Sequence, residues 1–364
     1  LRFSYFIGFN VDPNTRPDIK THVKYPFYWA NICPGCMKLL IDNSLPLIKE
    51  LYESSDHELY FFDKSTQSMT QNVDVVICRA HSKINQSFFN GYHAALVATV
   101  SSGSDHLDKA WLGQQNVKWI DAIGSNARSV SDYVLHLLHH PNIPINGKKI
   151  GIIGVGHVGE RLNKALVSLG FDTVLYDPPR AQRDATFQSQ PIDALFQCGV
   201  ISLHVPLNKE GPHKTTDLLN ESFLSRCKPS GLIINTSRGE VIKENALLTN
   251  AHLRYCLDVY CQEPNINPSI IKQCLITTPH IAGHAIEAKQ RAMLMVLNKI
   301  LSFFNLTKSE TPFDDLLTST KTSLTTPLNL TYDPMHETHQ LKIQPTAEQF
   351  ISLRKAHTQR HELV

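Results

Sequence analysis

Short apolar runs alternate with amphipathic segments in the first part of the chain. Residues 39–41, 73–78 and 95–100 are apolar runs of strand length, and residues 45–54 carry apolar side chains at the spacing of one helical face. Strands that alternate with helices at short intervals are typical of a parallel sheet with helices on its faces. We therefore expect an α/β domain that begins near Met37.

A second series of the same kind begins at Lys148 and continues to about His280. Helical periodicity precedes this series at residues 129–140 and follows it at residues 285–305. The chain from residue 312 onward is polar and rich in threonine. Its weaker patterns indicate two strands, at 328–332 and 340–343, and a final helix from Ala347.

Composition narrows the class of protein. The 364 residues are 42% hydrophobic and 19% charged, and the formal net charge is +2, from 35 lysines and arginines against 33 aspartates and glutamates. These values exclude a wholly disordered chain and a nucleic-acid-binding protein that works through bulk positive charge. No apolar run approaches the ~18 residues needed to cross a bilayer, and the length suggests two or three domains.

The first 36 residues differ from the rest. Four prolines break any helix there, and the chain starts at Leu1 rather than at a methionine, so we expect residues 1–36 to be an extension without a catalytic role. Cys33 and Cys36 have the spacing of a redox dithiol or of half a zinc site, but no second pair follows, and we expect no metal. The remaining cysteines are scattered in apolar stretches, as free thiols are in a reducing cytoplasm.

An apolar strand leads directly into a glycine-rich turn. Gly154, Gly156 and Gly159 form a G-x-G-x-x-G pattern that opens a helix, and such glycines allow a tight turn and the close approach of a pyrophosphate. The next strand ends in Asp177, where a carboxylate would bind the ribose of NAD and repel the 2′-phosphate of NADP. The alternative is an ordinary strand-to-helix turn in which Asp177 caps a helix.

Three further polar residues, Arg238, Glu263 and His280, each follow a predicted strand, where doubly wound sheets bind their ligands. An imidazole can accept a hydroxyl proton as a hydride leaves the same carbon, and a carboxylate can orient that imidazole. A guanidinium can hold a substrate carboxylate through two hydrogen bonds. Taken singly, Arg238 could bind a helix end, Glu263 could be a solvated turn residue, and His280 could be an ordinary core or surface histidine. Only the joint pattern suggests a dehydrogenase for 2-hydroxy acids.

Several stretches belong to one pattern: the Gly154 turn, residues 201–207, 235–239 and 257–259, and residues 279–283. With them the chain resembles the D-isomer-specific 2-hydroxyacid dehydrogenases, from about Met37 to Leu306. The resemblance implies two doubly wound parallel-sheet domains. A Rossmann-type NAD domain (127–282) would be inserted in a flavodoxin-like substrate domain (37–126 and 283–308), followed by a short α+β dimerisation region (309–364).

The resemblance also implies roles for individual residues. His280 would be the acid/base, Glu263 its partner, and Arg238 a catalytic group that binds substrate. Contacts to NAD would come from Gly154, Gly156, His157, Val158, Gly159, Asp177, Thr236, Ser237, Arg238, Asp258 and Gly283. Contacts to substrate would come from Arg79, Ala80, Ser101, Arg128 and His284.

Two positions depart from the family pattern, which has a serine at Ala80 and a tyrosine at His284. Four further segments, at 102–108, 177–181, 209–215 and 280–289, narrow the resemblance to members that act on a small phosphorylated 2-hydroxy acid. A phosphate requires cations or N–H donors. The candidates are Arg79, Lys83, His106, Arg128 and His284.

The prediction is therefore a cytoplasmic, homodimeric, NAD-dependent dehydrogenase with no nucleic-acid or membrane partner. One alternative is a D-2-hydroxy acid dehydrogenase for an unphosphorylated substrate. Another is an NAD-sensing binding protein of the corepressor type, which keeps the fold but acts through protein contacts. A third, suggested by Leu1, Ala80 and the short C-terminal region, is the product of a decaying gene.

Overall fold

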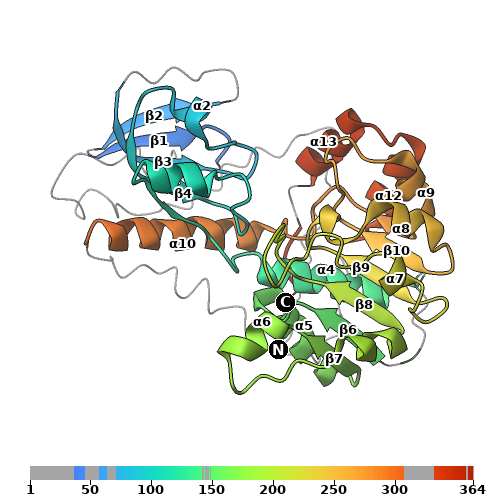
Figure 1. The fold of residues 1–364 in the computed structure, drawn as a ribbon. Coiled ribbons are helices and arrows are strands. Elements are labelled where there is room, and N and C mark those ends of the chain that lie inside the picture. Colours follow the sequence, from blue (N-terminus) through green and yellow to red (C-terminus); the bar gives the residue numbers. More distant parts are fainter. Residues whose placement is uncertain are drawn as a thin grey trace, which may run out of the picture.

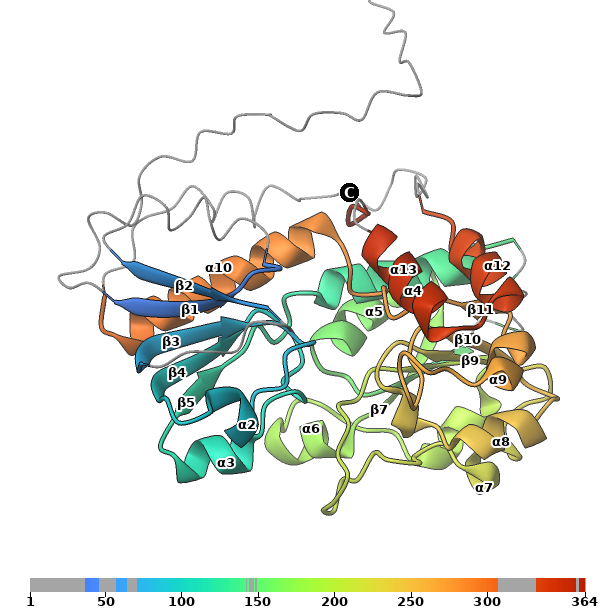
Figure 2. The ribbon, with the colours of Figure 1, turned by 90° about the horizontal axis from the view of Figure 1, so that it is seen from above.

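The computed structural model describes residues 37–45, 57–63, 71–141, 143, 147, 149–306, 332–357 and 360–363. They form two lobes that lie side by side, each built on a parallel sheet with helices on its faces (Figures 1 and 2). The expected α/β architecture with two parallel sheets is confirmed.

The first lobe is built on a five-stranded sheet in the order β2-β1-β3-β4-β5, which is the flavodoxin-like order. All neighbouring strands are parallel, and the three central strands are almost continuously buried, as strands covered on both faces are. The strands are β1 (Lys38–Asp42), β2 (Glu58–Phe62), β3 (Val73–Cys78), β4 (Ala94–Thr99) and β5 (Lys118–Ile120).

A helix from late in the chain covers one face of this sheet. Helix α10 (Ile286–Phe303) packs Met293, Val296 and Ile300 onto the core side chains of β1, β3 and β4, so the predicted helix at 285–305 is confirmed. The short helices α2 (Gln86–Phe89) and α3 (Lys109–Gln114) lie against the other face. The helix predicted at 45–54 lies outside the described residues, apart from Leu45.

The second lobe is built on a six-stranded parallel sheet in the order β11-β10-β9-β8-β6-β7. The chain moves from β6 to β7 on one side and then crosses to β8 on the other side of β6, which places a switch point at the carboxyl end of β6. The strands are β6 (Lys149–Ile153), β7 (Asp172–Tyr176), β8 (Val200–Leu203), β9 (Leu232–Asn235), β10 (Arg254–Leu257) and β11 (Ile276–Thr277).

Helices cover both faces of the second sheet. The long amphipathic helices α4 (Ala127–His139) and α5 (His157–Ser168) share a core with β6 on one face. The other face carries short helices whose buried residues include Leu224, Leu247 and Ile270. These helices are α7 (Glu221–Leu224), α8 (Glu244–Thr249) and α9 (Pro268–Gln273). Between β7 and β8 lie helix α6 (Pro178–Arg183) and a 3-10 turn (Ile192–Gln197), and a second 3-10 turn (Gly239–Val241) follows β9.

The described part of the C-terminal region is helical and packs at the β11 edge of the second sheet. Helix α12 (Met335–Ile343) places the hydroxyl of Thr338 3.1 Å from both the N–H and the C=O of Thr277, and Leu341 joins the buried core. The strand predicted at 340–343 is therefore wrong, because these residues form the last turn of α12. The predicted final helix is confirmed as α13 (Ala347–Ala356).

Two further features concern only the described residues. Their six cysteines are free thiols, and five of the six are buried. None of their helices combines the length and the apolar character that a bilayer crossing requires. Cys33 and Cys36, and the strand predicted at 328–332 apart from Tyr332, lie outside the described part of the chain.

Candidate active site

A large cleft of about 3020 Å³ separates the carboxyl ends of the two sheets. All the residues proposed above for cofactor, substrate or catalysis line this cleft, except Gly159, which lies behind the turn. In the first lobe they come from the loops after β3 and β4. In the second they come from the start of α4, from the turn after β6 with the start of α5, and from the loops after β7, β9, β10 and β11. The sheet topology therefore brings together side chains that are far apart in the sequence.

The glycines of the turn after β6 have distinct roles. Gly154 has φ +87°, and a Cβ there would lie 2.6 Å from the carbonyl oxygen of His204. A Cβ at Gly159 would collide with the carbonyl oxygen of Gly154, whereas a Cβ at Gly156 would meet nothing within 4 Å. Gly154 and Gly159 thus allow the turn and its packing. Gly156 leaves open space at the N-terminus of α5, where backbone N–H groups and the helix dipole favour a phosphate.

Asp177 fits both interpretations that the sequence allowed. Its Oδ1 accepts the N–H of Arg180 at 2.9 Å and so caps α6, while its Oδ2 accepts the N–H of Val155 at 2.8 Å. The carboxylate is therefore fixed beside the glycine turn, at the end of β7, where a ribose-binding acid belongs. Arg180 is ion-paired with Glu160 and Asp184.

His280 and Glu263 form a directly bonded pair. Nδ1 of His280 lies 2.7 Å from Oε2 of Glu263, and Oε1 of Glu263 accepts the N–H of Tyr260 at 2.9 Å. Burial opposes ionisation of Glu263, but the charge and hydrogen bond of His280 and the Tyr260 amide outweigh it and lower the pKa of this carboxyl. Nε2 of His280 has no partner among the described residues, and the side chain lines the cleft.

The loop that carries His280 has an unusual backbone. His280 has φ +57°, a left-handed conformation that a residue with a Cβ keeps only where its surroundings enforce it. The buried carboxylate of Asp258 accepts the Thr278 hydroxyl at 2.6 Å and the N–H groups of Ile281 and Ala282 at 2.8 and 2.9 Å. Burial raises the pKa of Asp258 despite these bonds. Asp258 lines the cleft, and its hydrogen bonds go to the loop.

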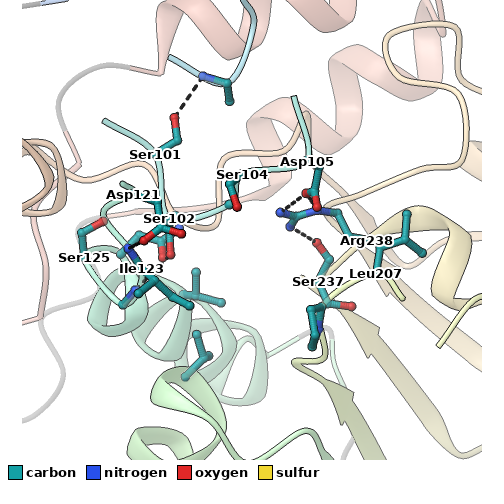
Figure 3. Close-up of a pocket in the computed structure, with 18 of the residues that line it drawn as sticks. Ser101, Ser102, Ser104, Asp105, Asp121, Ile123, Ser125, Leu207, Ser237 and Arg238 are labelled. Atoms are coloured by element: carbon teal, nitrogen blue, oxygen red, sulfur yellow. Dashed lines mark hydrogen bonds and ion pairs between the residues drawn. The ribbon is translucent and has the colours of Figure 1, made fainter. Parts of the chain in front are cut away.

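Arg238, which follows the end of β9, is held by two partners (Figure 3). Its Nη2 and Nε lie 2.7 and 2.8 Å from Oδ2 of Asp105 in the first lobe, and its Nη1 donates to the carbonyl oxygen of Ser237 at 2.7 Å. A Cβ at Gly103 would collide with Nη2 of Arg238, so this glycine lets the guanidinium approach the loop. Sequence reasoning gave Asp105 no role, although it lies within the characteristic 102–108 segment.

A buried asparagine shapes the loop that carries Arg238. Oδ1 of Asn235 accepts both the N–H and the hydroxyl of Ser237, at 3.0 and 2.8 Å, and Nδ2 of Asn235 donates to the carbonyl oxygen of Arg238 at 2.9 Å. Thr236 directs its hydroxyl toward Nδ1 of His204, at 3.4 Å. The 236–238 segment is thus fixed at the edge of the cleft by side-chain bonds.

On the opposite wall, three of the predicted substrate residues, Arg79, Ala80 and Ser101, lie close together. The hydroxyl of Ser101 accepts the N–H of Ala80 at 3.0 Å (Figure 3), and Arg79 donates to the carbonyl oxygen of Ser44 at 3.1 Å. His284 lies deeper, and burial together with the nearby Arg354 lowers its pKa well below the usual range. It is therefore a neutral donor or acceptor at neutral pH.

Two of the predicted phosphate-binding cations are engaged elsewhere. His106 bonds to the hydroxyl of Thr99 at 2.9 Å, and burial lowers its pKa to about 4, so it is uncharged at neutral pH. Arg128 lies 3.8 Å from Asp132 and 3.7 Å from Glu362, which balance its charge. Lys83 is exposed at the rim of the cleft.

Two cations that sequence reasoning missed line the cleft near Arg79. Lys289 comes from α10 and Arg354 from α13, where Nη1 of Arg354 lies 3.9 Å from Oε2 of Glu263. The pKa of Lys289 is lowered, first by burial and then by the positive charge of Arg79. The pKa of Arg79 is lowered in turn by burial and by the positive charge of Arg354. These cations repel one another in a partly buried place, which favours an anionic ligand.

The comparison with known proteins agrees with this geometry. Residues 127–282 match the model of the D-isomer specific 2-hydroxyacid dehydrogenase, NAD binding domain. The second lobe is thus an NAD-binding domain, and the chain belongs to the D-isomer specific 2-hydroxyacid dehydrogenase family, as the sequence motifs predicted. Within that family it is similar to proteins named erythronate-4-phosphate dehydrogenase. The one from Legionella pneumophila is 37% identical over 338 residues, which cover 90% of this chain and 95% of that protein. The one from Klebsiella pneumoniae is 34% identical over 349 residues, covering 90% and 92%.

Solved structures share the fold at lower identity. The NAD⁺-bound 3-phosphoglycerate dehydrogenase of Entamoeba histolytica superposes with a TM-score of 0.62 at 23% identity, covering 74% of this chain and 96% of that one. The NAD-dependent formate dehydrogenase of Staphylococcus aureus, in complex with NAD, gives a TM-score of 0.59 at 23% identity and the same coverage. These likenesses support the two-lobed architecture.

Proposed function

We propose that this protein oxidises the C2 hydroxyl of 4-phospho-D-erythronate to give (R)-3-hydroxy-2-oxo-4-phosphobutanoate, with NAD as the oxidant, in pyridoxal 5′-phosphate (vitamin B6) biosynthesis. The observation that carries the proposal is the bonded His280–Glu263 pair in a cleft that also holds Arg238 and a group of cations. The names of its relatives support the choice of substrate.

The cofactor would bind along the second lobe. The space above Gly156, which a Cβ would otherwise enter, fits a pyrophosphate, and Asp177 fits a ribose. His157 and Val158 begin α5 beside it, while Thr236, Ser237, Asp258 and Gly283 line the cleft further along. NAD, when bound, supplies the acceptor for the hydride that leaves C2 of the substrate.

His280 would move the proton. Its Nδ1–H donates to Glu263, which leaves Nε2 free to accept the proton of the substrate hydroxyl. The ionised Glu263 carboxylate then stabilises the imidazolium that forms and fixes the orientation of the ring. In the reverse direction the same Nε2–H protonates the oxygen of the keto group.

Arg238 would hold the substrate carboxylate. Nη1 and Nη2 each carry a second N–H besides those bonded to Ser237 and Asp105, so the guanidinium can still donate to a carboxylate through both. Because Asp105 and Ser237 fix the plane of the guanidinium, the substrate would be oriented by a rigid group. Ser101, beside Ala80, lies on the opposite wall and would contact the substrate there.

The distal phosphate would bind among Arg79, Lys289 and Arg354, with His284 as a neutral donor. Each of the three cations comes from a different element, the loop after β3, α10 and α13. A doubly charged phosphate would relieve their mutual repulsion. Unchanged KM for the phosphorylated substrate in a His284→Ala variant would contradict the role of His284.

The proposal extends to the domains, the oligomeric state and the location of the protein. We infer that residues 127–282 form the cofactor domain, that 37–126 with 283–308 form the substrate domain, and that 309–364 contribute to a homodimer. The free thiols of the described cysteines favour a reducing, cytoplasmic location.

The test of the function is NADH formation from 4-phospho-D-erythronate and NAD. Its absence in folded protein that binds NADH would contradict the proposal.

A further inference from the structure

The loop of residues 280–284, which we call the histidine loop, is held from two sides. Asp258 accepts its N–H groups, as described above. On the other side Arg360 donates to its carbonyl groups: Nε bonds to the oxygen of His284 at 3.1 Å, and Nη2 to the oxygens of Ile281, at 3.2 Å, and Ala282. Asp258 and Arg360, which are far apart in the sequence, thus bind the N–H groups and the C=O groups of the same short loop.

Arg360 is buried to an unusual degree for a cation. Its relative exposure is 7%, and within the described part of the chain it forms no ion pair. The guanidinium lies 5.7 and 5.5 Å from the ring centres of Tyr133 and Tyr332, and its other bond, at 3.5 Å, is to the carbonyl oxygen of Ser129. Burying such a group is costly unless its N–H groups find acceptors. Nη1 of Arg360 has no acceptor among the described residues, and most of the bonds from Nε and Nη2 go to the histidine loop.

The segment that carries Arg360 is anchored independently of the loop. Glu362 accepts two bonds from Arg291 of α10, at 2.7 and 3.0 Å, and the hydroxyl of Ser129 of α4 at 2.8 Å. The carbonyl oxygen of Arg360 accepts the N–H of Ile286, at the start of α10. Residues 360–363 therefore lie between α4 of the second lobe and α10, which packs on the first (Figure 2).

We propose that Arg360 is a positioning residue for His280: it fixes the carbonyl groups of the histidine loop so that His280 keeps its left-handed backbone and its bond to Glu263. The proposal rests on the proposed acid/base role of His280. A left-handed non-glycine residue persists only where the surrounding structure over-determines it, and Asp258 and Arg360 together provide that constraint. Neither residue needs to touch substrate to do so.

Three variants test the proposal: Arg360→Met, Arg360→Lys and the neighbouring His361→Gln as a matched control. His361 is exposed and bonds through its side chain to Glu287, not to the loop. The first measurement is steady-state turnover, with the kinetic isotope effect of substrate deuterated at C2. The second, which needs no substrate, is amide hydrogen exchange of the peptide that covers residues 280–284.

We expect R360M to lower kcat about 10- to 100-fold, as a displaced catalytic group does, with a larger isotope effect and unchanged NADH affinity. R360K, which keeps the charge but can reach fewer carbonyls, should fall between R360M and wild type, and it decides the matter if R360M does not fold. Exchange at 280–284 should be faster in both variants and unchanged in H361Q.

Wild-type kcat and wild-type exchange in a folded Arg360 variant would overturn the proposal, as would a loss of kcat explained by weaker NADH binding. Failure of wild type to form NADH contradicts the proposed function instead, and the exchange measurement still tests the role of Arg360.

Discussion

Arg238 of the second lobe and Asp105 of the first lobe form an ion pair of 2.7 Å across the cleft. The two residues are 133 positions apart in the sequence, and Gly103 provides the space in which they meet. The pair links the loop after β4 to the loop after β9, so the same contact that orients Arg238 also joins the two sides of the candidate site (Figure 3).

Removing Asp105 should weaken substrate binding without affecting the cofactor. In Asp105→Ala the guanidinium of Arg238 loses two charge-assisted bonds, and we expect KM for the hydroxy acid to rise about tenfold, with KM for NAD unchanged. Gly103→Ala should have the same effect by displacing the guanidinium. Steady-state kinetics with each substrate varied in turn measure this. Equal changes in both KM values would show that the pair matters only for the fold.

The Glu263–His280 bond should appear in both activity and stability. Glu263→Gln removes the charge that supports the imidazolium, and we expect kcat to fall by roughly 10²-fold. Because the pKa of Glu263 is lowered in the folded protein, its ionisation stabilises the fold above the ordinary value of 4.5, and this contribution is lost as pH falls through the lowered pKa.

Thermal unfolding of wild type and E263Q over a pH series measures the stability effect. The difference in Tm should be present at neutral pH and should shrink below pH 4.5, toward the lowered pKa of Glu263. A Tm difference that grows on acidification would have the wrong sign for a carboxyl with a lowered pKa and would contradict the assignment.

The cation group should distinguish phosphorylated from unphosphorylated substrate. Lys289→Met and Arg354→Met each remove one charge near the proposed phosphate, and we expect KM for 4-phospho-D-erythronate to rise about 10- to 100-fold. Turnover of D-erythronate, which lacks the phosphate, should not change. Lys272→Met, at an exposed position on α9, is the control for a general loss of charge. An equal effect of K289M on both substrates would place Lys289 outside the phosphate site.

Asp177 should set the choice of cofactor. Serine at this position keeps a helix cap for α6 but removes the charge that repels a 2′-phosphate. In Asp177→Ser we expect the preference for NAD over NADP, measured as the ratio of kcat/KM values, to fall at least about tenfold. Asp172→Ser, at the exposed start of the same strand, should leave the ratio unchanged. An unaltered ratio in D177S would mean that Asp177 is only a helix cap.

In the first sheet, the local pattern predicted the central strands but not the edge strands. The runs at 39–41, 73–78 and 95–100 belong to central strands, which are buried on both faces and read as continuous apolar segments. Strands β2 and β5 lie at the two edges, and their partly exposed side chains give no such run. The strand expected at 340–343 was wrong because a short apolar and polar alternation at a helix end mimics a strand.

The site divides in the same way. The glycine turn, Asp177 and the residues at strand ends could be predicted, since short motifs and the topology of parallel sheets fix their positions. The contacts of four others could not be predicted, because they arise from packing between segments distant in sequence; these residues are Asp105, Lys289, Arg354 and Arg360. Asp105 and Lys289 lie within characteristic segments, but a segment does not show which distant side chain its residues meet. Conversely, His106 and Arg128 are side chains that could bind a phosphate, but His106 bonds to Thr99 and Arg128 pairs with Glu362. The sequence does not reveal these partners.

The most direct test of the account is an assay of the purified chain with NAD and 4-phospho-D-erythronate, beside D-erythronate and a panel of other unphosphorylated D-2-hydroxy acids. We predict NADH formation with the phosphorylated acid at a kcat/KM at least about 100-fold above that of any other acid. In His280→Ala we predict that this turnover falls by orders of magnitude while NADH binding is retained. Preference for an unphosphorylated acid, or full turnover in H280A, would contradict it. So would NADH binding without any turnover, as expected of an NAD-sensing binding protein.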